Sequence, residues 1–165
     1  MSDPTHPSQH RAVVITVSTR ATAGVYADRS GPVIAEALTG LGFDVRGPEL
    51  VPDGDAVGAA LRAAVEQDVA VVITTGGTGL NPDDHTPEQT RLVIDREIPE
   101  LMSAIARFGV DHGVPTAVLS RGVAGTSGRT LIVNLPGSSG GARDGMVVLG
   151  PILSHAVSQI RGGGH

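Results

Sequence analysis

Apolar runs rich in β-branched residues alternate along this chain with segments of helical periodicity, and this alternation constrains the fold more than any other feature. Strands are predicted at residues 12–18, 44–51, 69–75, 116–120 and 130–135. Helices are predicted at residues 30–42, 55–67, 99–109 and 141–160, with a short one that Thr86 caps and that continues through "PEQT". Strands that are joined through helices form right-handed crossovers and lie parallel. We therefore expect an α/β fold of three layers, α/β/α, with a mostly parallel central sheet.

A chain of 165 residues is long enough for one compact domain, and no linker or internal repeat divides it. The first ten residues are polar and proline-rich, and the chain ends in "GGGH". We therefore expect flexible tails at 1–10 and 162–165 around a single domain at 11–161. No segment has the apolar core of a signal peptide or the length of a membrane span, which favours a cytoplasmic protein without membrane contact.

Charge and residue types exclude several classes of function. The net charge is -5, there is no Trp and only one Tyr, so neither the basic surface nor the stacking aromatics of nucleic-acid binding are present. The chain has no Cys, which excludes thiolate metal sites and cysteine nucleophiles. All 12 basic residues are arginine, so mechanisms that need a lysine are excluded as well. No histidine has the spacing of a zinc site.

The segment "VVITTGGTGLNPDDHTPEQT", residues 71–90, carries the strongest local signal. In parallel sheets, ligands bind where strands end in loops. Gly76, Gly77 and Gly79 follow a predicted buried strand and would let backbone N–H groups approach an anion closely. Asp84 near such a site indicates a cation, and Mg²⁺ is the one that prefers oxygen ligands. The adjacent Asp83 is interpreted as a solvated loop residue.

Two further loops follow predicted strands. Residues 133–145, "VNLPGSSGGARDG", offer hydroxyl and N–H donors in front of the last helix. Residues 16–31 carry Ser18 and Arg20 directly after the first strand, where Arg20 either contacts ligand or serves solubility. Two Gly-rich loops could hold two ends of a phosphorylated ligand. Asp53, after the second strand, is by itself a turn residue or an acid that flanks a helix.

Five segments together resemble the MogA/MoaB family of molybdenum-cofactor biosynthesis, whose adenylyltransferase fold also forms the G domain of gephyrin. They are "VSTRATAGVYADRSG", "LVPDGD", "TTGGTGLNPDDHTPEQT", "LSRGVAG" and "LIVNLPGSSGG", in this order. The resemblance covers residues 11–161. It implies a molybdopterin-binding domain that forms a homotrimer, or a hexamer as in part of the MoaB branch, and that can contact other enzymes of the same cofactor. Active members transfer AMP from Mg·ATP to the terminal phosphate of molybdopterin and release pyrophosphate.

The same resemblance assigns roles to residues. The two functionally important aspartates of the family correspond to Asp53 and Asp84, which would be catalytic and hold Mg²⁺. Substrate binding would involve Thr75, Gly76, Gly77, Thr78, Gly79, Ser120, Arg121, Pro136, Gly137, Ser138 and Ser139. From their position after the first strand, Ser18 and Arg20 are also expected to bind substrate. The arginines Arg20 and Arg121 would neutralise phosphate charge.

Two positions depart from the family pattern. Many members have Asp where this chain has Thr19, and many have lysine where it has Gly140. Arg143 lies three positions beyond and is not an equivalent point charge. The enzyme interpretation rests on the presence of both aspartates, whereas the missing lysine favours a non-catalytic molybdopterin- or nucleotide-binding protein that acts as carrier or assembly partner. A generic nucleotide-binding module would require the motifs to match by coincidence.

Overall fold

The computed structural model describes residues 9–25 and 27–163 of the chain, and its strands form one six-stranded sheet in the order β2-β1-β3-β6-β5-β4. The strands are β1 (Arg11–Val17), β2 (Asp44–Val51), β3 (Val71–Thr75), β4 (Arg96–Glu97), β5 (Ala124–Ser127) and β6 (Thr130–Leu135). The first four strands of this order run parallel, whereas β5 is antiparallel to both of its neighbours. The predicted α/β fold with a mostly parallel sheet is confirmed.

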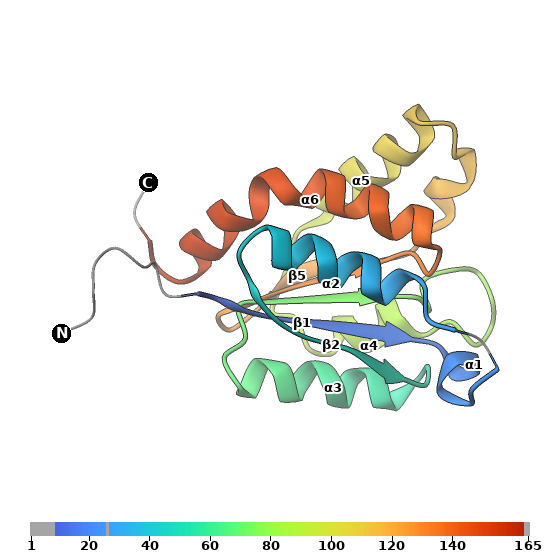
Figure 1. Ribbon diagram of the computed structural model, residues 1–165, viewed down its shortest axis with the longest axis horizontal. Coiled ribbons are helices and arrows are strands. Elements are labelled where there is room, and N and C mark those ends of the chain that lie inside the picture. Colours follow the sequence, from blue (N-terminus) through green and yellow to red (C-terminus); the bar gives the residue numbers. More distant parts are fainter. Residues whose placement is uncertain (1–8, 26, 164–165) are drawn as a thin grey trace.

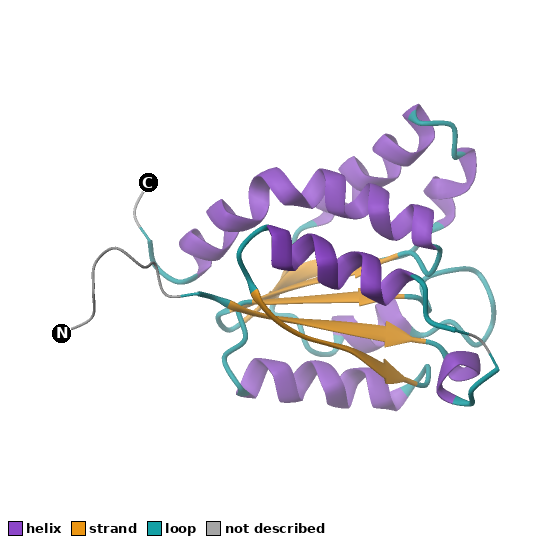
Figure 2. Ribbon diagram, viewed as in Figure 1, coloured by secondary structure: helices purple, strands orange, loops and turns teal. Residues whose placement is uncertain are grey.

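Helices cover both faces of this sheet. They are α1 (Thr19–Thr22), α2 (Ser30–Gly40), α3 (Asp55–Glu66), α4 (Thr86–Arg91), α5 (Pro99–Asp111), the 3-10 helix η1 (Pro115–Leu119) and α6 (Ser139–Ile160). In Figure 1, α2 and α6 lie on one face of the sheet and α3 lies on the other. The three layers are plain in Figure 2, where strands separate two groups of helices. Within the described part of the chain, no helix has the length and apolar character to cross a membrane.

The continuous apolar run of β1 exists because both faces of the strand are buried. Val14 faces the core that α2 and α6 complete with Ile34 and Leu149, and all three side chains are fully buried. Ile15 faces the opposite core, where Leu61 of α3 packs. A strand that is covered on both faces has no polar alternation, which is why the run reads as uninterrupted.

The antiparallel edge of the sheet was not predicted correctly. The prediction of a strand at residues 116–120 is wrong: residues 115–119 form η1, which packs against α5 and leaves Val118 63% and Leu119 49% exposed. Pro115 at the first position of η1 fixes a helical φ and has no N–H to donate to a neighbouring strand. The strand that pairs with β6 is instead β5, "AGTS", which has weak strand propensity.

The carboxyl ends of the parallel strands meet at one end of the molecule, to the right in Figure 1. The loops after β1 and β3 and the start of α6 lie there, whereas β1 begins and α6 ends at the opposite end. Of the expected tails, the structure describes only residues 9–10 and 162–163; residues 1–8 and 164–165 lie outside the described residues, as does residue 26. The topology thus gathers the motif-bearing loops of the sequence at the carboxyl ends of the parallel strands.

Candidate functional site

A pocket of about 1040 Å³ opens at the carboxyl ends of the parallel strands. One part of its wall is made by the two Gly-rich loops and by the start of α6, the other part by α5 and η1. Eight of the predicted site residues line it: Gly77, Thr78, Gly79, Asp84, Ser120, Pro136, Gly137 and Ser138. The remaining predicted residues, Ser18, Arg20, Asp53, Thr75, Gly76, Arg121 and Ser139, are not part of its lining.

The two Gly-rich loops are bonded directly to each other. The Thr75 hydroxyl donates to the carbonyl of Pro136 at 2.6 Å, and the Gly76 N–H donates to the carbonyl of Leu135 at 3.1 Å. A Cβ on Gly137 would lie 3.2 Å from the Cα of Gly76, so the two loops approach as closely as glycines allow. Thr75 and Gly76 therefore hold the two loops together and do not line the pocket themselves.

Two glycines of "GGTG" are required because carboxylates and a hydroxyl occupy the space beside them. A Cβ on Gly77 would lie 2.2 Å from Thr86 Oγ1 and 2.5 Å from Asp53 Oδ2, and its φ is +68°. A Cβ on Gly79 would lie 2.8 Å from Asp84 Oδ2. These contacts bring the carboxylates of both predicted aspartates against one Gly-rich loop.

Asp53 reaches this loop from the end of β2. Its Oδ1 accepts hydrogen bonds from the backbone N–H of Gly54 at 2.8 Å and from that of His85 at 3.0 Å. Burial raises the pKa of the Asp53 carboxyl above its ordinary value, and the charge of Asp84 adds to this; the two hydrogen bonds offset the rise only in part. Asp84 is thus close enough for its charge to contribute to the raised pKa of Asp53.

The oxygen atoms around Gly77 and Gly79 fit the ligand preferences of Mg²⁺. Asp53 Oδ2, Asp84 Oδ2 and the hydroxyl of Thr86 all face this loop, and Thr86 Oγ1 is buried without a hydrogen-bond partner among the described residues. In the same part of the chain, no group of three or more His, Cys, Asp and Glu is arranged to hold a metal alone. Mg²⁺ at this position would need further oxygen ligands from water and phosphate, which is its usual coordination in nucleotide enzymes. The predicted capping role of Thr86 is wrong, because α4 begins at Thr86 and its N-cap residue is His85.

The start of α6 forms another part of the pocket wall. The Ser138 hydroxyl caps this helix by accepting from the Gly141 N–H at 3.0 Å. A Cβ on Gly140 would have no described heavy atom within 4 Å, so this position has room for a side chain. Arg143, one turn into the helix, lines the pocket together with Asp144. Arg143 is the one arginine among the described residues that line the pocket.

The guanidinium of Arg121 is directed at protein oxygens beside the pocket. Its Nε donates to the carbonyl of Gly79 and its Nη2 to the carbonyl of Asp84, both at 2.9 Å. Its Nη1 forms an ion pair with Glu88 Oε1 at 2.6 Å. Desolvation acts to raise the pKa of Glu88, but the hydrogen bond from Arg121 and other favourable contacts outweigh it, so this pKa lies below its ordinary value. The guanidinium is therefore bonded to protein oxygens on three sides.

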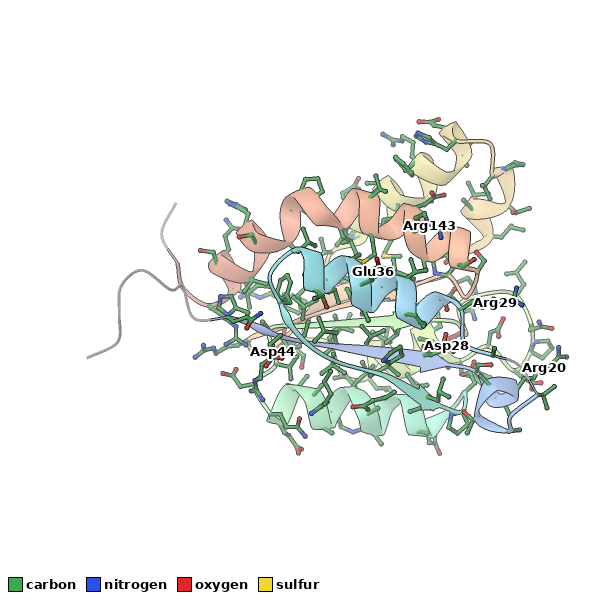
Figure 3. All side chains as sticks on the ribbon, viewed as in Figure 1. Arg20, Asp28, Arg29, Glu36, Asp44 and Arg143 are labelled. Atoms are coloured by element: carbon green, nitrogen blue, oxygen red, sulfur yellow. The ribbon has the colours of Figure 1, made fainter. Side chains whose placement is uncertain are left out.

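The first loop lies beside the pocket rather than in it. The Ser18 hydroxyl caps α1 by accepting from the Ala21 N–H at 3.0 Å. Thr19 Oγ1 accepts from the backbone N–H of Asp53 at 3.3 Å, so this loop contacts the site through Asp53. Figure 3 shows Arg20 on α1 and Arg143 near the start of α6, well apart in the view.

The apolar wall of the pocket was missed by the sequence prediction. Its residues from α5 are Met102, Ile105, Ala106 and Gly109, and Leu80, Val114, Ala117 and Leu119 continue it. The spacing of the four α5 residues is that of one helix face, so the periodicity could have indicated a shared surface. His112 lines the same wall and stacks on Phe108, with ring centroids 3.9 Å apart. This half of the pocket suits a largely apolar group.

A buried polar network below the site was also missed. The Asn134 side chain donates to the hydroxyls of Thr74 at 2.9 Å and Thr90 at 3.0 Å, and its Oδ1 accepts from the Val123 N–H at 3.0 Å. Thr90 in turn donates to the carbonyl of Thr86 at 2.8 Å. The network links β3, β6 and α4 beneath the two Gly-rich loops. Asn134 precedes "LPG" in an otherwise apolar strand, and this lone amide was the available signal.

Comparison with known proteins identifies the kind of domain to which this site belongs. The model of the probable molybdopterin binding domain matches residues 13–155. The molybdopterin adenylyltransferase of Escherichia coli K12 is 37% identical over 132 residues, which are 77% of this chain and 67% of the relative. The molybdenum cofactor biosynthesis bifunctional protein of Chlorobaculum tepidum is 33% identical over 161 residues, or 97% of this chain. The chain spans 50% of the length of that bifunctional relative.

Solved structures give the same result. The molybdopterin biosynthesis Mog protein of Mycobacterium ulcerans has a TM-score of 0.87 and 54% identity, over 92% of this chain and 99% of that one. The molybdopterin biosynthesis enzyme MoaB of Thermus thermophilus also has a TM-score of 0.87, with 43% identity over 93% of this chain and 98% of that one. The predicted resemblance is confirmed: the chain belongs to the MogA/MoaB family of molybdopterin-binding domains in molybdenum cofactor biosynthesis.

Proposed function

We propose that this protein is a molybdopterin adenylyltransferase that uses ATP and Mg²⁺. The terminal phosphate of molybdopterin would attack the α-phosphorus of ATP, a new phosphorus–oxygen bond would form, and the bond to pyrophosphate would break. The products are adenylylated molybdopterin and pyrophosphate. Relatives named molybdopterin adenylyltransferase at 35–37% identity support this reaction type.

The observation that carries the proposal is the contact between two carboxylates and one Gly-rich loop at the edge of the pocket. Asp53 approaches Gly77, and Asp84 approaches Gly79. A protein that only binds phosphates gains nothing from two carboxylates beside them, because they repel the ligand. A cation between carboxylates and phosphates removes this repulsion, and nucleotidyl transfer uses such a cation.

The chain's own task in this reaction is mainly to position two polyanions. The attacking phosphate oxygen is already ionised, so it needs little help from a general base. The loops at Gly77–Gly79 and Pro136–Ser138 offer N–H and hydroxyl donors that would hold the reacting phosphates in line. Mg²⁺, bound by Asp53 and Asp84, would supply neutralisation of the phosphate charge. The apolar wall from α5 and η1 would hold a flat ring of pterin or adenine.

Arg143 is the side chain that we assign to the neutralisation of substrate phosphate from the protein side. It lines the pocket, whereas Arg20 and Arg121 do not. Within the described residues it forms no hydrogen bond or ion pair, so its guanidinium is available for a ligand. Arginine binds phosphate in a bidentate manner, a geometry that differs from the point charge of the lysine expected at position 140.

A second candidate function is binding of molybdopterin without catalysis. It is favoured by the absence of lysine at Gly140 and by the position of Arg121, which is bonded to protein oxygens. In that case the protein would act as a carrier or an assembly partner for other enzymes of the cofactor.

Release of pyrophosphate distinguishes the two functions. Purified protein is incubated with ATP and Mg²⁺, with and without molybdopterin, and binding of molybdopterin is measured separately. Release that requires molybdopterin supports the enzyme. Tight binding of molybdopterin without any release supports the second candidate.

We also propose a cytoplasmic homotrimer, with a hexamer as the alternative assembly. Exposed apolar side chains that do not line the pocket, at Leu92, Val118, Val147 and Ile152, support association, because such side chains are often covered in oligomers. Light scattering coupled to size-exclusion chromatography measures the assembly directly, and a monomeric mass over a range of concentrations would contradict it.

A further inference from the structure

Arg121 is bonded to both ends of the segment that presents Asp84. Its backbone N–H donates to the carbonyl of Thr78 at 2.8 Å, and its side chain donates to the carbonyls of Gly79 and Asp84. The last two carbonyls stand at the beginning and the end of residues 79–84. One planar guanidinium thereby fixes the distance between the Gly-rich loop and the carboxylate-bearing residue.

The guanidinium also has an anchor on α4. Nη1 pairs with Glu88 at 2.6 Å, and Glu88 lies in the first turn of the helix that follows Asp84. The guanidinium of Arg121 therefore links three successive parts of the chain: the Gly-rich loop, Asp84 and the start of α4. Since the N–H directions of arginine are fixed in one plane, this arrangement has little freedom to change.

A direct role of Arg121 in phosphate binding is difficult to combine with these contacts. Its side chain does not line the pocket, and its charge is already paired with Glu88. A phosphate that bound to it would have to displace a carbonyl or the carboxylate. Arg143 lines the pocket and has no such partner among the described residues.

We propose that Arg121 is a positioning residue, which holds the 79–84 segment and thereby the carboxylate of Asp84, and that it is not a ligand of substrate phosphate. The catalytic part of this inference rests on the proposed adenylyl transfer. The structural part, the hold on the segment, is independent of any reaction.

The first test measures amide hydrogen exchange in the protein without substrates. Within the segment, the Asn81 N–H donates to Asp84 Oδ2 at 3.2 Å and the Asp84 N–H donates to the Asn81 carbonyl at 3.0 Å. Arg121→Lys keeps the charge but cannot reach three separate oxygens with one ammonium group. We expect these amides to exchange ~10-fold faster in Arg121→Lys, because local opening becomes easier. Unchanged exchange would overturn the inference whatever the protein catalyses.

The second test measures turnover of the same variants. We expect Arg121→Lys and Arg121→Ala to lose kcat by ~100-fold, with KM for molybdopterin changed less than ~3-fold, because displacement of a catalytic group affects the reacting geometry. A phosphate ligand predicts the opposite: KM rises, kcat is retained, and lysine restores much of the affinity. That result would overturn the inference.

Matched controls distinguish the loss of the Arg121 hydrogen bonds from the general effect of replacing an arginine. Arg107→Lys changes an exposed arginine of α5 that is not part of the pocket lining, and we expect wild-type exchange and turnover. Glu88→Gln retains an acceptor for Nη1 and leaves both carbonyl bonds intact, so its effect should be less than that of Arg121→Lys. If the wild-type protein itself shows no turnover, the proposed reaction fails, and the exchange data alone decide the structural part.

Discussion

Asp53 Oδ1 accepts a hydrogen bond from the backbone N–H of His85 at 3.0 Å, and this bond joins the loop after β2 to the segment that carries Asp84. The other oxygen of the same carboxylate faces Gly77. Asp53 is therefore both a structural link between two loops and an available oxygen ligand. Its burial makes this double role costly, because an ionised carboxylate loses solvation there.

The raised pKa of Asp53 predicts a pH-dependent penalty to stability. A carboxyl whose pKa is higher in the folded state stabilises the fold below its ordinary value of 3.8, and this contribution is lost as the pH rises through the folded-state pKa. Asp53→Asn does not titrate and keeps an acceptor for His85. We expect the stability of the variant relative to the wild type to increase with pH across the acid range and then to level off.

Urea unfolding of both proteins between about pH 3 and about pH 7 measures this difference in stability. Effects of other titrating groups, such as Glu88, are shared by the two proteins and largely cancel. A relative stability that is constant or falls with pH would show that burial does not raise this pKa.

Gly77→Ala tests the close approach of the Gly-rich loop to its polar neighbours. The new Cβ would meet Thr86 Oγ1 and Asp53 Oδ2, and a φ of +68° is unfavourable for alanine. We expect a loss of about 1–3 kcal/mol in the free energy of unfolding and a larger relative loss of activity. Gly140→Ala is the control, because its Cβ has no described neighbour within 4 Å. Equal behaviour of the two variants would contradict the packing described for Gly77.

Asn134→Ala tests the buried network that supports both loops. Its removal leaves the Val123 N–H without its acceptor and takes away the donor to Thr74 and Thr90. We expect destabilisation of about 3 kcal/mol, measured by chemical denaturation. Ser154→Ala, at an exposed position of α6, should change stability by less than about 0.5 kcal/mol. A small effect at Asn134 would mean that the network contributes little.

The parallel part of the fold was predictable because local periodicity and burial agree there. The β1 strand is apolar on both faces, and α3 and α6 each have one apolar face that packs against the sheet. The antiparallel edge was not predictable from propensity, because β5 is "AGTS" and is a strand through its pairing with β6. The hairpin formed by β5 and β6 did have one signal in the sequence, which is the glycine at position 128. Gly128, with a φ of +56°, and Arg129 form a two-residue loop between the paired residues Ser127 and Thr130.

The polar half of the pocket was predictable for a related reason. Glycines, serines and Asp84 follow strand ends, and a parallel sheet brings strand ends together. The roles of the arginines were not predictable, because sequence position does not show where a long side chain finds its partners. Arg121 turns to protein carbonyls, whereas Arg143 lines the pocket from one turn inside α6.

Arg143→Ala should weaken binding of molybdopterin by ~10-fold or more, because a charge-assisted contact to phosphate is lost. Gly140→Lys in the same background should recover a large part of the affinity, since position 140 lines the pocket and has room for a side chain. Titration calorimetry with molybdopterin measures both, and Arg107→Ala is the control. Unchanged affinity in Arg143→Ala would remove this residue from the phosphate site.

Pyrophosphate release from Mg·ATP, compared between the wild-type protein and Asp84→Asn, tests the proposed reaction most directly. We expect release that depends on molybdopterin in the wild type and falls by ~100-fold or more in Asp84→Asn, while molybdopterin binding stays within ~3-fold, because Asp84 acts on charge and geometry in the transition state. Molybdopterin-dependent release at the same rate in both proteins would contradict a catalytic role for Asp84. No release from a wild-type protein that binds molybdopterin would contradict the adenylyltransferase itself.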